Sequence, residues 1–226
     1  MKRQVFIVGR GKLAQELLQE LDPGESFEVL PWPEPAAAPS QAIVIHAGSG
    51  KALPQLFAYC TATGSTLIEL ATGTDLGAPD ERFPLLLCPN TNILMLKFMH
   101  MLTQCGASFH GYSQQLIESH QANKSSTPGT AVSMAQALGI PEDAIQSVRD
   151  PKVQQHELGI PEEHLARHAF HRILIADEIC SLKLESQVYG AAPYAAGVAK
   201  IVAAVHAHPL ESRRYEIQEL VAQGWI

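Results

Sequence analysis

Residues 4–14 decide the fold of this chain: Gln4-Val5-Phe6-Ile7-Val8-Gly9-Arg10-Gly11-Lys12-Leu13-Ala14. The run before Gly9 is short, apolar and rich in β-forming residues, which predicts a strand. The residues after it show helical periodicity, with one apolar stripe made of Leu13, Leu17, Leu18 and Leu21. Strand, glycine turn and helix in this order are typical of the first crossover in a dinucleotide-binding sheet. Gly9 would make the tight turn, Gly11 would admit a pyrophosphate, and Ala14 would let the helix pack closely on the strand.

The same turn predicts the kind of cofactor. Arg10 and Lys12 flank it, either as counter-charges for the pyrophosphate or the extra phosphate of NADPH, or as solvated loop charges. The acidic residue that usually guards the ribose is absent from the end of the next strand-like run, 27–30. We therefore predict NADPH or NADH as cofactor, with weak discrimination. The contacts predicted from this turn are Gly9, Gly11, Lys12 and Leu13.

The rest of the chain first alternates strands and helices and then changes texture. Strands are predicted at 41–46, 66–70 and 85–88, helices at 51–63 and 93–104, and a proline-rich loop at 31–39. Further on, strand-like runs at 112–120, 144–150, 168–176 and 179–189 surround a helix at 131–138, before a last helix at 194–206. This predicts an α/β fold. A Rossmann-like nucleotide-binding domain (1–91 plus 195–226) would carry an α+β mixed-sheet domain for substrate binding and oligomerisation (92–194).

Composition argues against several classes of protein. With 226 residues, 46% of them hydrophobic, the chain can bury a full core, and a net charge of −7 without a basic block argues against nucleic-acid binding. No apolar run approaches the length of a membrane span, and no signal peptide is recognised. The four cysteines form no C-x-x-C pair and are expected to be reduced and mostly buried. We expect a cytoplasmic protein that binds neither nucleic acid nor membrane.

A second informative stretch is Glu118-Ser-His-Gln-Ala-Asn-Lys-Ser-Ser-Thr-Pro-Gly-Thr130. It places an imidazole, His120, and an ammonium, Lys124, four residues apart after a strand-like run. Gly129 and Thr130 then open a helix, where free backbone N–H groups can bind a carboxylate. Lys124 adds a point charge, and His120 can donate a proton near neutral pH. The alternative is a surface helix that happens to follow a His and a Lys.

This stretch resembles the motif of the dihydrodipicolinate reductases (4-hydroxy-tetrahydrodipicolinate reductases), Glu-x-His-(His or Gln)-x-x-Lys-x-Asp-x-(Pro)-Ser-Gly-Thr. Five positions match in order: Glu118, His120, Lys124, Gly129 and Thr130. One residue is missing before Gly129, Pro128 stands where a serine is usual, and Ala191 replaces an arginine expected further on. Weaker similarities to the same family lie at Thr72-Gly73, Pro89-Asn90-Thr91-Asn92, Arg167 to His171 and Glu185 to Gly197.

The resemblance implies an NAD(P)H-dependent oxidoreductase that reduces a dihydrodipicolinate-type cyclic imine in lysine and diaminopimelate biosynthesis. It also implies a homotetramer assembled through the second domain's sheet, with the active site in a cleft between the domains. His120 and Lys124 would be catalytic. The small dicarboxylate substrate would contact Lys124, Gly129, Thr130 and Thr72, and the cofactor would also contact Thr72, Pro89 and Asn90. The departures leave two alternatives: a family member that reduces a different cyclic imine acid, or a paralogue that has lost the cofactor and serves as a binding or regulatory subunit.

The remaining histidines give no predicted metal site. His164, His168 and His171 have suggestive spacings, but an odd separation on a strand predicts that His168 and His171 point to opposite faces. His168 is interpreted as a residue near the core of the second domain. His46 has no partner recognisable in the sequence and stays unassigned.

Overall fold

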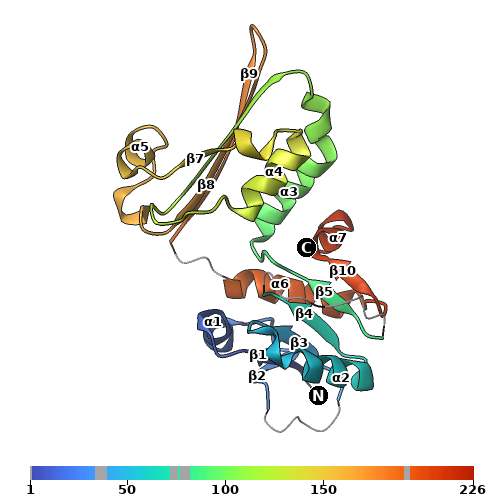
Figure 1. Ribbon diagram of the computed structural model, residues 1–226. Coiled ribbons are helices and arrows are strands. Elements are labelled where there is room, and N and C mark those ends of the chain that lie inside the picture. The colour runs from blue at the N-terminus through green and yellow to red at the C-terminus, as the bar shows by residue number, and fades with distance from the viewer. Residues whose placement is uncertain (1, 34–39, 72–75, 77–81, 191–193) are drawn as a thin grey trace. The chain divides into compact units, whose positions relative to one another are not determined.

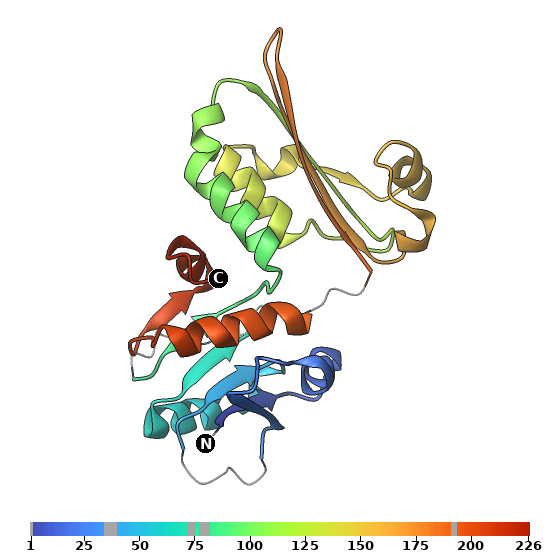
Figure 2. The same cartoon turned by 180° about the vertical axis from the view of Figure 1, so that it is seen from behind.

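A computed structural model describes residues 2–33, 40–71, 76, 82–190 and 194–226. The chain divides into two compact units, shown in Figure 1 and from behind in Figure 2. Unit 1 comprises Met1–Leu96 and Pro193–Ile226, and unit 2 comprises Lys97–Ala192. Each unit is built on its own β-sheet.

Unit 1 contains a six-stranded parallel sheet in the order β10-β5-β4-β3-β1-β2. Its strands are β1 (Arg3–Val8), β2 (Phe27–Pro31), β3 (Ile43–His46), β4 (Thr66–Glu69), β5 (Leu85–Leu87) and β10 (Arg214–Glu216). Because β1 lies between β2 and β3, the direction in which successive strands are added reverses at β1. Open α/β sheets bind their ligands at such a point, outside the carboxyl ends of the strands.

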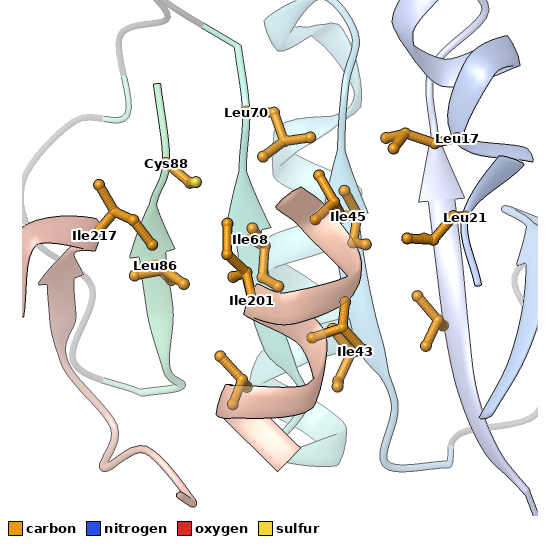
Figure 3. Packing of buried hydrophobic residues seen from close by; sticks show 14 of the residues in the cluster. Leu17, Leu21, Ile43, Ile45, Ile68, Leu70, Leu86, Cys88, Ile201 and Ile217 are labelled. Carbon is orange, nitrogen blue, oxygen red and sulfur yellow. The ribbon is translucent and has the colours of Figure 1, made fainter. Parts of the chain in front are cut away.

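Helices cover both faces of this sheet: α1 (Lys12–Glu20), α2 (Leu53–Thr63), α6 (Tyr194–Ala207) and α7 (Ile217–Ala222), with a 3₁₀ turn η1 (Gly50–Ala52) before α2. Side chains alternate along β1, so Val5 and Ile7 pack with α1, α6 and α7, whereas Phe6 packs with α2. Figure 3 shows the first of these two clusters. The predicted α1 stripe was wrong at Leu18, which is 39% exposed, because it lies about 100° around the helix from the buried Leu17.

Unit 2 contains a four-stranded mixed sheet in the order β7-β6-β8-β9. Its elements are β6 (Ser113–His120), β7 (Gln146–Val148), β8 (His168–Ala176), β9 (Ser181–Tyr189), α4 (Gly129–Leu138), α5 (Pro151–His156), and the 3₁₀ turns η2 (Gly106–Phe109), η3 (Glu142–Ala144) and η4 (Glu162–His164). Strands β6 and β7 are parallel, and the other two pairs are antiparallel. Helix α3 (Ile93–Cys105), which begins in unit 1, and α4 lie on one side of this sheet, and α5 lies on the other (Figures 1 and 2).

The predicted fold class is confirmed, and the differences are local. Helix α5 is absent from the sequence prediction, although Asp150 caps it by accepting a hydrogen bond from the Lys152 N–H (2.8 Å) and Pro151 fills its first position. Two of the cysteines, Cys105 and Cys180, are exposed rather than buried. Among the described residues, no helix has the length and apolarity needed to cross a bilayer.

Candidate active site

A pocket of about 1220 Å³ opens at the carboxyl edge of the unit 1 sheet. It is formed where the loops after β1, β2, β3 and β4 meet the start of α2. The residues that line it include Gly9, Arg10, Gly11, Leu13, Trp32, His46, Ala47, Gly48, Ser49, Lys51, Gln55 and Ala71. The glycine turn therefore lies at the switch point of the sheet, where a dinucleotide would be expected.

Gly9 and Gly11 in this turn are required to be glycine for different physical reasons. Gly9 has φ +142°, and a Cβ there would lie 2.5 Å from the carbonyl oxygen of Ala47, so both the backbone and the packing require glycine. Gly11 has an ordinary φ of −77°, and a Cβ there would meet no atom within 4 Å. Neither strain nor packing explains Gly11, whereas a ligand approaching the backbone would.

The charges around this pocket favour an anion. Arg10 and Lys51 line it, and no Asp or Glu is among the described residues that do so. At the end of β2, where an acidic ribose anchor is usual, the chain has Pro31 and Trp32. The Trp32 ring packs edge-on against Phe6, with ring centroids 5.6 Å apart.

The pocket gathers only some of the predicted cofactor contacts. Gly9, Gly11 and Leu13 line it. Lys12, Pro89 and Asn90 are not among its lining residues, and the Asn90 side chain instead accepts a hydrogen bond from the Asn92 N–H (2.9 Å). Thr72 lies outside the described residues. The roles of these residues in binding stay predictions.

In unit 2, His120 ends β6 and is held by a buried carboxylate two residues earlier. The His120 Nδ1 lies 2.8 Å from Glu118 Oε2, and Arg149 donates to Glu118 Oε1 over 2.5 Å. The Glu118 side chain is fully buried, whereas 14% of the His120 side chain is exposed. Because Nδ1 faces a carboxylate, Nδ1 carries a proton and donates it in this bond, which leaves Nε2 for a ligand.

The charge state of Glu118 follows from its partners. Burial alone would raise the pKa of this carboxyl, but hydrogen bonds from His120, Arg149 and Ser147 and the charge of Arg149 outweigh burial and lower it to about 2. Glu118 is therefore ionised throughout the physiological range. The ionised carboxylate accepts the hydrogen bond from His120 Nδ1 and so fixes the orientation of the imidazole ring.

Arg149, which follows β7, and Gln154 of α5 fix the chain around His120. The Gln154 side chain donates to the His120 carbonyl oxygen (2.8 Å) and to Ser119 Oγ (3.0 Å). Arg149 Nε donates to the Lys124 carbonyl oxygen over 2.9 Å. Gln154 and Arg149 thus hold the end of β6, and Arg149 also holds the turn that carries Lys124.

His168 and His171 flank this cluster on opposite faces of the sheet, as predicted. His168 Nε2 lies 2.9 Å from Ser119 Oγ, and burial is the main cause that lowers its pKa. His171 is the register partner of Glu118, and its ring centroid is 5.9 Å from that of His120. Burial, and then the charge of His120, lower the pKa of His171 to about 4, so it is neutral at physiological pH. No potential metal-binding group of His, Cys, Asp and Glu was found among the described residues.

The start of α4 lies on the same chain segment, nine residues after His120. The helix begins at Gly129 rather than at the predicted Ala131, and no side chain caps it. A Cβ at Gly129 would meet nothing within 4 Å, so there is room beside the start of the helix, whose first backbone N–H groups have no partner within the helix. Thr130 is the second residue of this helix, and Lys124 is half-buried in the preceding turn.

No role was predicted for Arg149, Gln154 or the carboxylate of Glu118. Glu118 was matched as part of a motif, but the spacing of two residues on a strand is what places it beside His120. The Asp150-Pro151 pair, a helix-start signal, could have revealed α5 and with it Gln154. Arg149 follows β7 directly, but its partner is 31 residues away in sequence and is set by the parallel pairing of β6 with β7.

A parallel sheet with a glycine turn at its first crossover, joined to a second unit with its own sheet, is the architecture of two-domain dinucleotide-binding proteins. No protein-family model matches this chain. Over 109 residues, 45% of this chain, it is 41% identical to 4-hydroxy-tetrahydrodipicolinate reductase 1, chloroplastic, of Arabidopsis thaliana. Over 134 residues, 55% of the chain, it is 37% identical to 4-hydroxy-tetrahydrodipicolinate reductase 2 of the same plant. These regions span 31% and 38% of the two relatives' own length.

Solved structures show the same fold. A dipicolinate-bound dihydrodipicolinate reductase from Paenisporosarcina sp. TG-14 matches 97% of this chain and 100% of its own, with a TM-score of 0.67 at 18% identity. A C. glutamicum DAP dehydrogenase in complex with DAP matches 96% of this chain and 93% of its own, with a TM-score of 0.52 at 8% identity. The resemblance drawn from the sequence motif is confirmed by these relatives, since about half of the chain is 37–41% identical to 4-hydroxy-tetrahydrodipicolinate reductases.

Proposed function

We propose that this protein reduces a dihydrodipicolinate-type cyclic imine to tetrahydrodipicolinate with NADPH or NADH, a step toward diaminopimelate and lysine. The observation that carries the proposal is the hydrogen-bonded chain from Arg149 through Glu118 to His120, in which Glu118 and His120 match the reductase motif. The names of the curated relatives and the dipicolinate-bound reductase of the same fold support it.

The reaction needs a proton where negative charge develops. A bound reduced nicotinamide would supply the hydride. His120 Nε2 would then donate its proton to the reduced ring, while Glu118 keeps the imidazole oriented through Nδ1. Lys124 and the N–H groups of Gly129 and Thr130 would hold a carboxylate of the substrate, because a helix start and an ammonium both favour negative charge.

Within this proposal, NADPH is the expected cofactor. Arg10, in the glycine turn beside the end of β2, would meet its extra phosphate, and no described acidic residue of the pocket would repel that phosphate. Fluorescence titration with NADPH and NADH tests this preference, with Arg10→Met expected to weaken NADPH binding and to leave NADH binding nearly unchanged. Equal weakening for both nucleotides would remove Arg10 from the phosphate site. Absence of binding by either would favour a paralogue without cofactor.

The central test is turnover of enzymatically generated dihydrodipicolinate, followed by oxidation of NADPH. We expect His120→Gln to lower kcat by about 10²-fold or more with little change in KM, since the proton transfer belongs to the transition state. His156→Gln, at the exposed end of α5, is the matched control and should leave turnover unchanged. Wild-type turnover in His120→Gln would refute the proton-donor role. Failure of the wild-type protein to oxidise NADPH with this substrate, despite binding the cofactor, would point to a different cyclic imine acid.

Assembly and location are part of the proposal. β9 is an edge strand of the unit 2 sheet, and the β8–β9 hairpin exposes Leu182 (46%) and Ile179 (97%). One face of this hairpin is not apolar, because Arg172 and Lys183 both pair with Glu185 there. We propose a homotetramer assembled through this sheet, with exposed apolar side chains covered by other copies. The protein would act in the cytoplasm.

A further inference from the structure

The unit 1 pocket contains a pair of buried, oppositely chargeable side chains that the proposed reaction does not use. His46 ends β3 and Glu69 ends β4, and the two are register partners in the parallel sheet. His46 Nδ1 lies 2.6 Å from Glu69 Oε2, and their side chains are 0% and 2% exposed. Groups of this kind are rarely buried unless each is hydrogen-bonded, because burial without a partner is strongly unfavourable.

Both side chains are also bonded to the loops that follow their strands. His46 Nε2 lies 3.2 Å from the carbonyl oxygen of Ser49, which can only accept, so Nε2 carries a proton and donates it. Glu69 Oε1 accepts a hydrogen bond from the Ala71 N–H over 2.7 Å. The pair therefore links the loop after β3 to the loop after β4.

These two loops form one side of the pocket, and the first of them touches the glycine turn. Ala47, Gly48, Ser49 and Ala71 all line the pocket. A Cβ added at Gly48 would lie 3.2 Å from Gly9 Cα and 3.3 Å from His46 Nε2, so glycine lets this loop pass close to both. The Ala47 N–H also donates to the Val8 carbonyl oxygen over 2.8 Å, which ties the loop to the residue before Gly9.

The place of the pair in the sheet indicates which half of a dinucleotide it serves. In such sheets the glycine turn after the first strand takes the pyrophosphate, and the end of the next strand takes the adenosine ribose. Here that next strand, β2, lies on one side of β1, and β3 and β4 lie on the other. The His46–Glu69 pair is therefore on the side that would receive the nicotinamide.

We propose that His46 and Glu69 form a positioning pair that holds the loops around the nicotinamide half of the cofactor, an inference that rests on the proposed function. The pair acts through hydrogen bonds rather than through charge. Glu69→Gln separates these two possibilities, because its amide oxygen can accept from the Ala71 N–H while its NH₂ donates to His46 Nδ1. All the ties to both loops are then kept without a carboxylate.

The test compares Glu69→Gln with the double variant His46→Phe/Glu69→Leu, in which apolar groups fill similar space but tie no loop. Replacing a buried pair on both sides commonly leaves a protein folded. Binding is measured with NADPH, and with adenosine 2′,5′-bisphosphate, which lacks the nicotinamide half. We expect the double variant to lose about tenfold or more in NADPH affinity. Glu69→Gln should bind NADPH like the wild type, and all three proteins should bind the bisphosphate alike.

Each other outcome overturns the inference. Wild-type NADPH affinity in the double variant would show that the pair serves the core only, and a loss in Glu69→Gln as large as in the double variant would show that charge matters. An equal loss of affinity for adenosine 2′,5′-bisphosphate would show that the substitutions disturb the whole pocket. Glu69→Leu alone replaces the double variant if that one does not fold. Failure of the wild-type protein to bind NADPH at all would instead refute the proposed function, which keeps the two failures distinguishable.

Discussion

Replacing Glu118 by Gln should remove a large, pH-dependent part of the stability of unit 2. The Glu118 side chain is fully buried, and its pKa is about 2 in the folded protein against an ordinary value of 4.5. Each pKa unit corresponds to about 1.4 kcal/mol, so the ionised carboxylate stabilises the fold by about 3 kcal/mol at pH 7 relative to a neutral group. A loss of this size is a substantial fraction of the total stability of a typical domain.

The sign of the pH dependence follows from the lowered pKa. Stabilisation by this carboxylate is complete above the unfolded-state pKa and is lost as the pH falls toward the folded-state pKa of about 2. The difference in unfolding free energy between wild type and Glu118→Gln should therefore be constant above pH ~5, and it should shrink by about 2 kcal/mol at pH 3. Other acidic groups titrate equally in both proteins and cancel in the difference.

Urea unfolding at several pH values measures this difference, and the probe must report on unit 2. Trp32 and Trp225 both lie in unit 1, so hydrogen exchange of the β6 amides is required. Glu185→Gln is the control, because Glu185 also pairs with an arginine of the same sheet but is 24% exposed, and its loss should stay near 1 kcal/mol or below. A Glu118→Gln difference that does not change between pH 7 and pH 3 would refute the reasoning.

Three further predictions concern binding and assembly. Lys124→Ala should weaken binding of dipicolinate, measured by calorimetry, and also lower kcat, because a carboxylate held by Lys124 orients the ring; unchanged affinity would exclude the contact. Gly11→Val should abolish NADPH binding without changing the unfolding midpoint, since a Cβ there meets no protein atom. Gly9→Ala should instead destabilise unit 1 by about 1–3 kcal/mol, because of the positive φ at Gly9 and a clash with the Ala47 carbonyl. Light scattering should give the mass of a homotetramer at micromolar concentration, and Ile179→Asp with Leu182→Asp should reduce it; a wild-type monomer would contradict the assembly.

The sequence was sufficient to predict those strands, turns and helices that depend on the pattern of neighbouring residues. The run from Gln4 to Ala14 was enough to predict a strand, a turn and a helix, because each rests on the periodicity and glycine content of neighbouring residues. The hairpin of β8 and β9 was recognisable for the same reason. Helix α5 was missed because it has only six residues and no apolar stripe long enough to show a period.

The hydrogen-bond partners of the candidate-site residues were harder to predict from the sequence than the motif itself. His46 could not be assigned from sequence because Glu69 is 23 residues away and becomes its neighbour only through the register of β3 and β4. Arg149 reaches Glu118 in the same way, through the parallel pairing of β6 and β7. A sequence motif marks residues on one segment, whereas charge states are set by residues on adjacent strands.

Residues outside the motif control how the candidate site works. The motif provides the groups that would meet the substrate, but His120 presents Nε2 only because Glu118 occupies its Nδ1. Glu118 remains ionised while buried only because donors that include Arg149 outweigh the effect of burial on its pKa. Arg149 also holds the Lys124 turn, so one residue outside the motif controls both predicted catalytic groups. Arg149→Met should therefore impair proton donation and carboxylate binding together, whereas His120→Gln should impair proton donation alone. If Arg149→Met lowered kcat with dipicolinate affinity unchanged, the two functions would be independent.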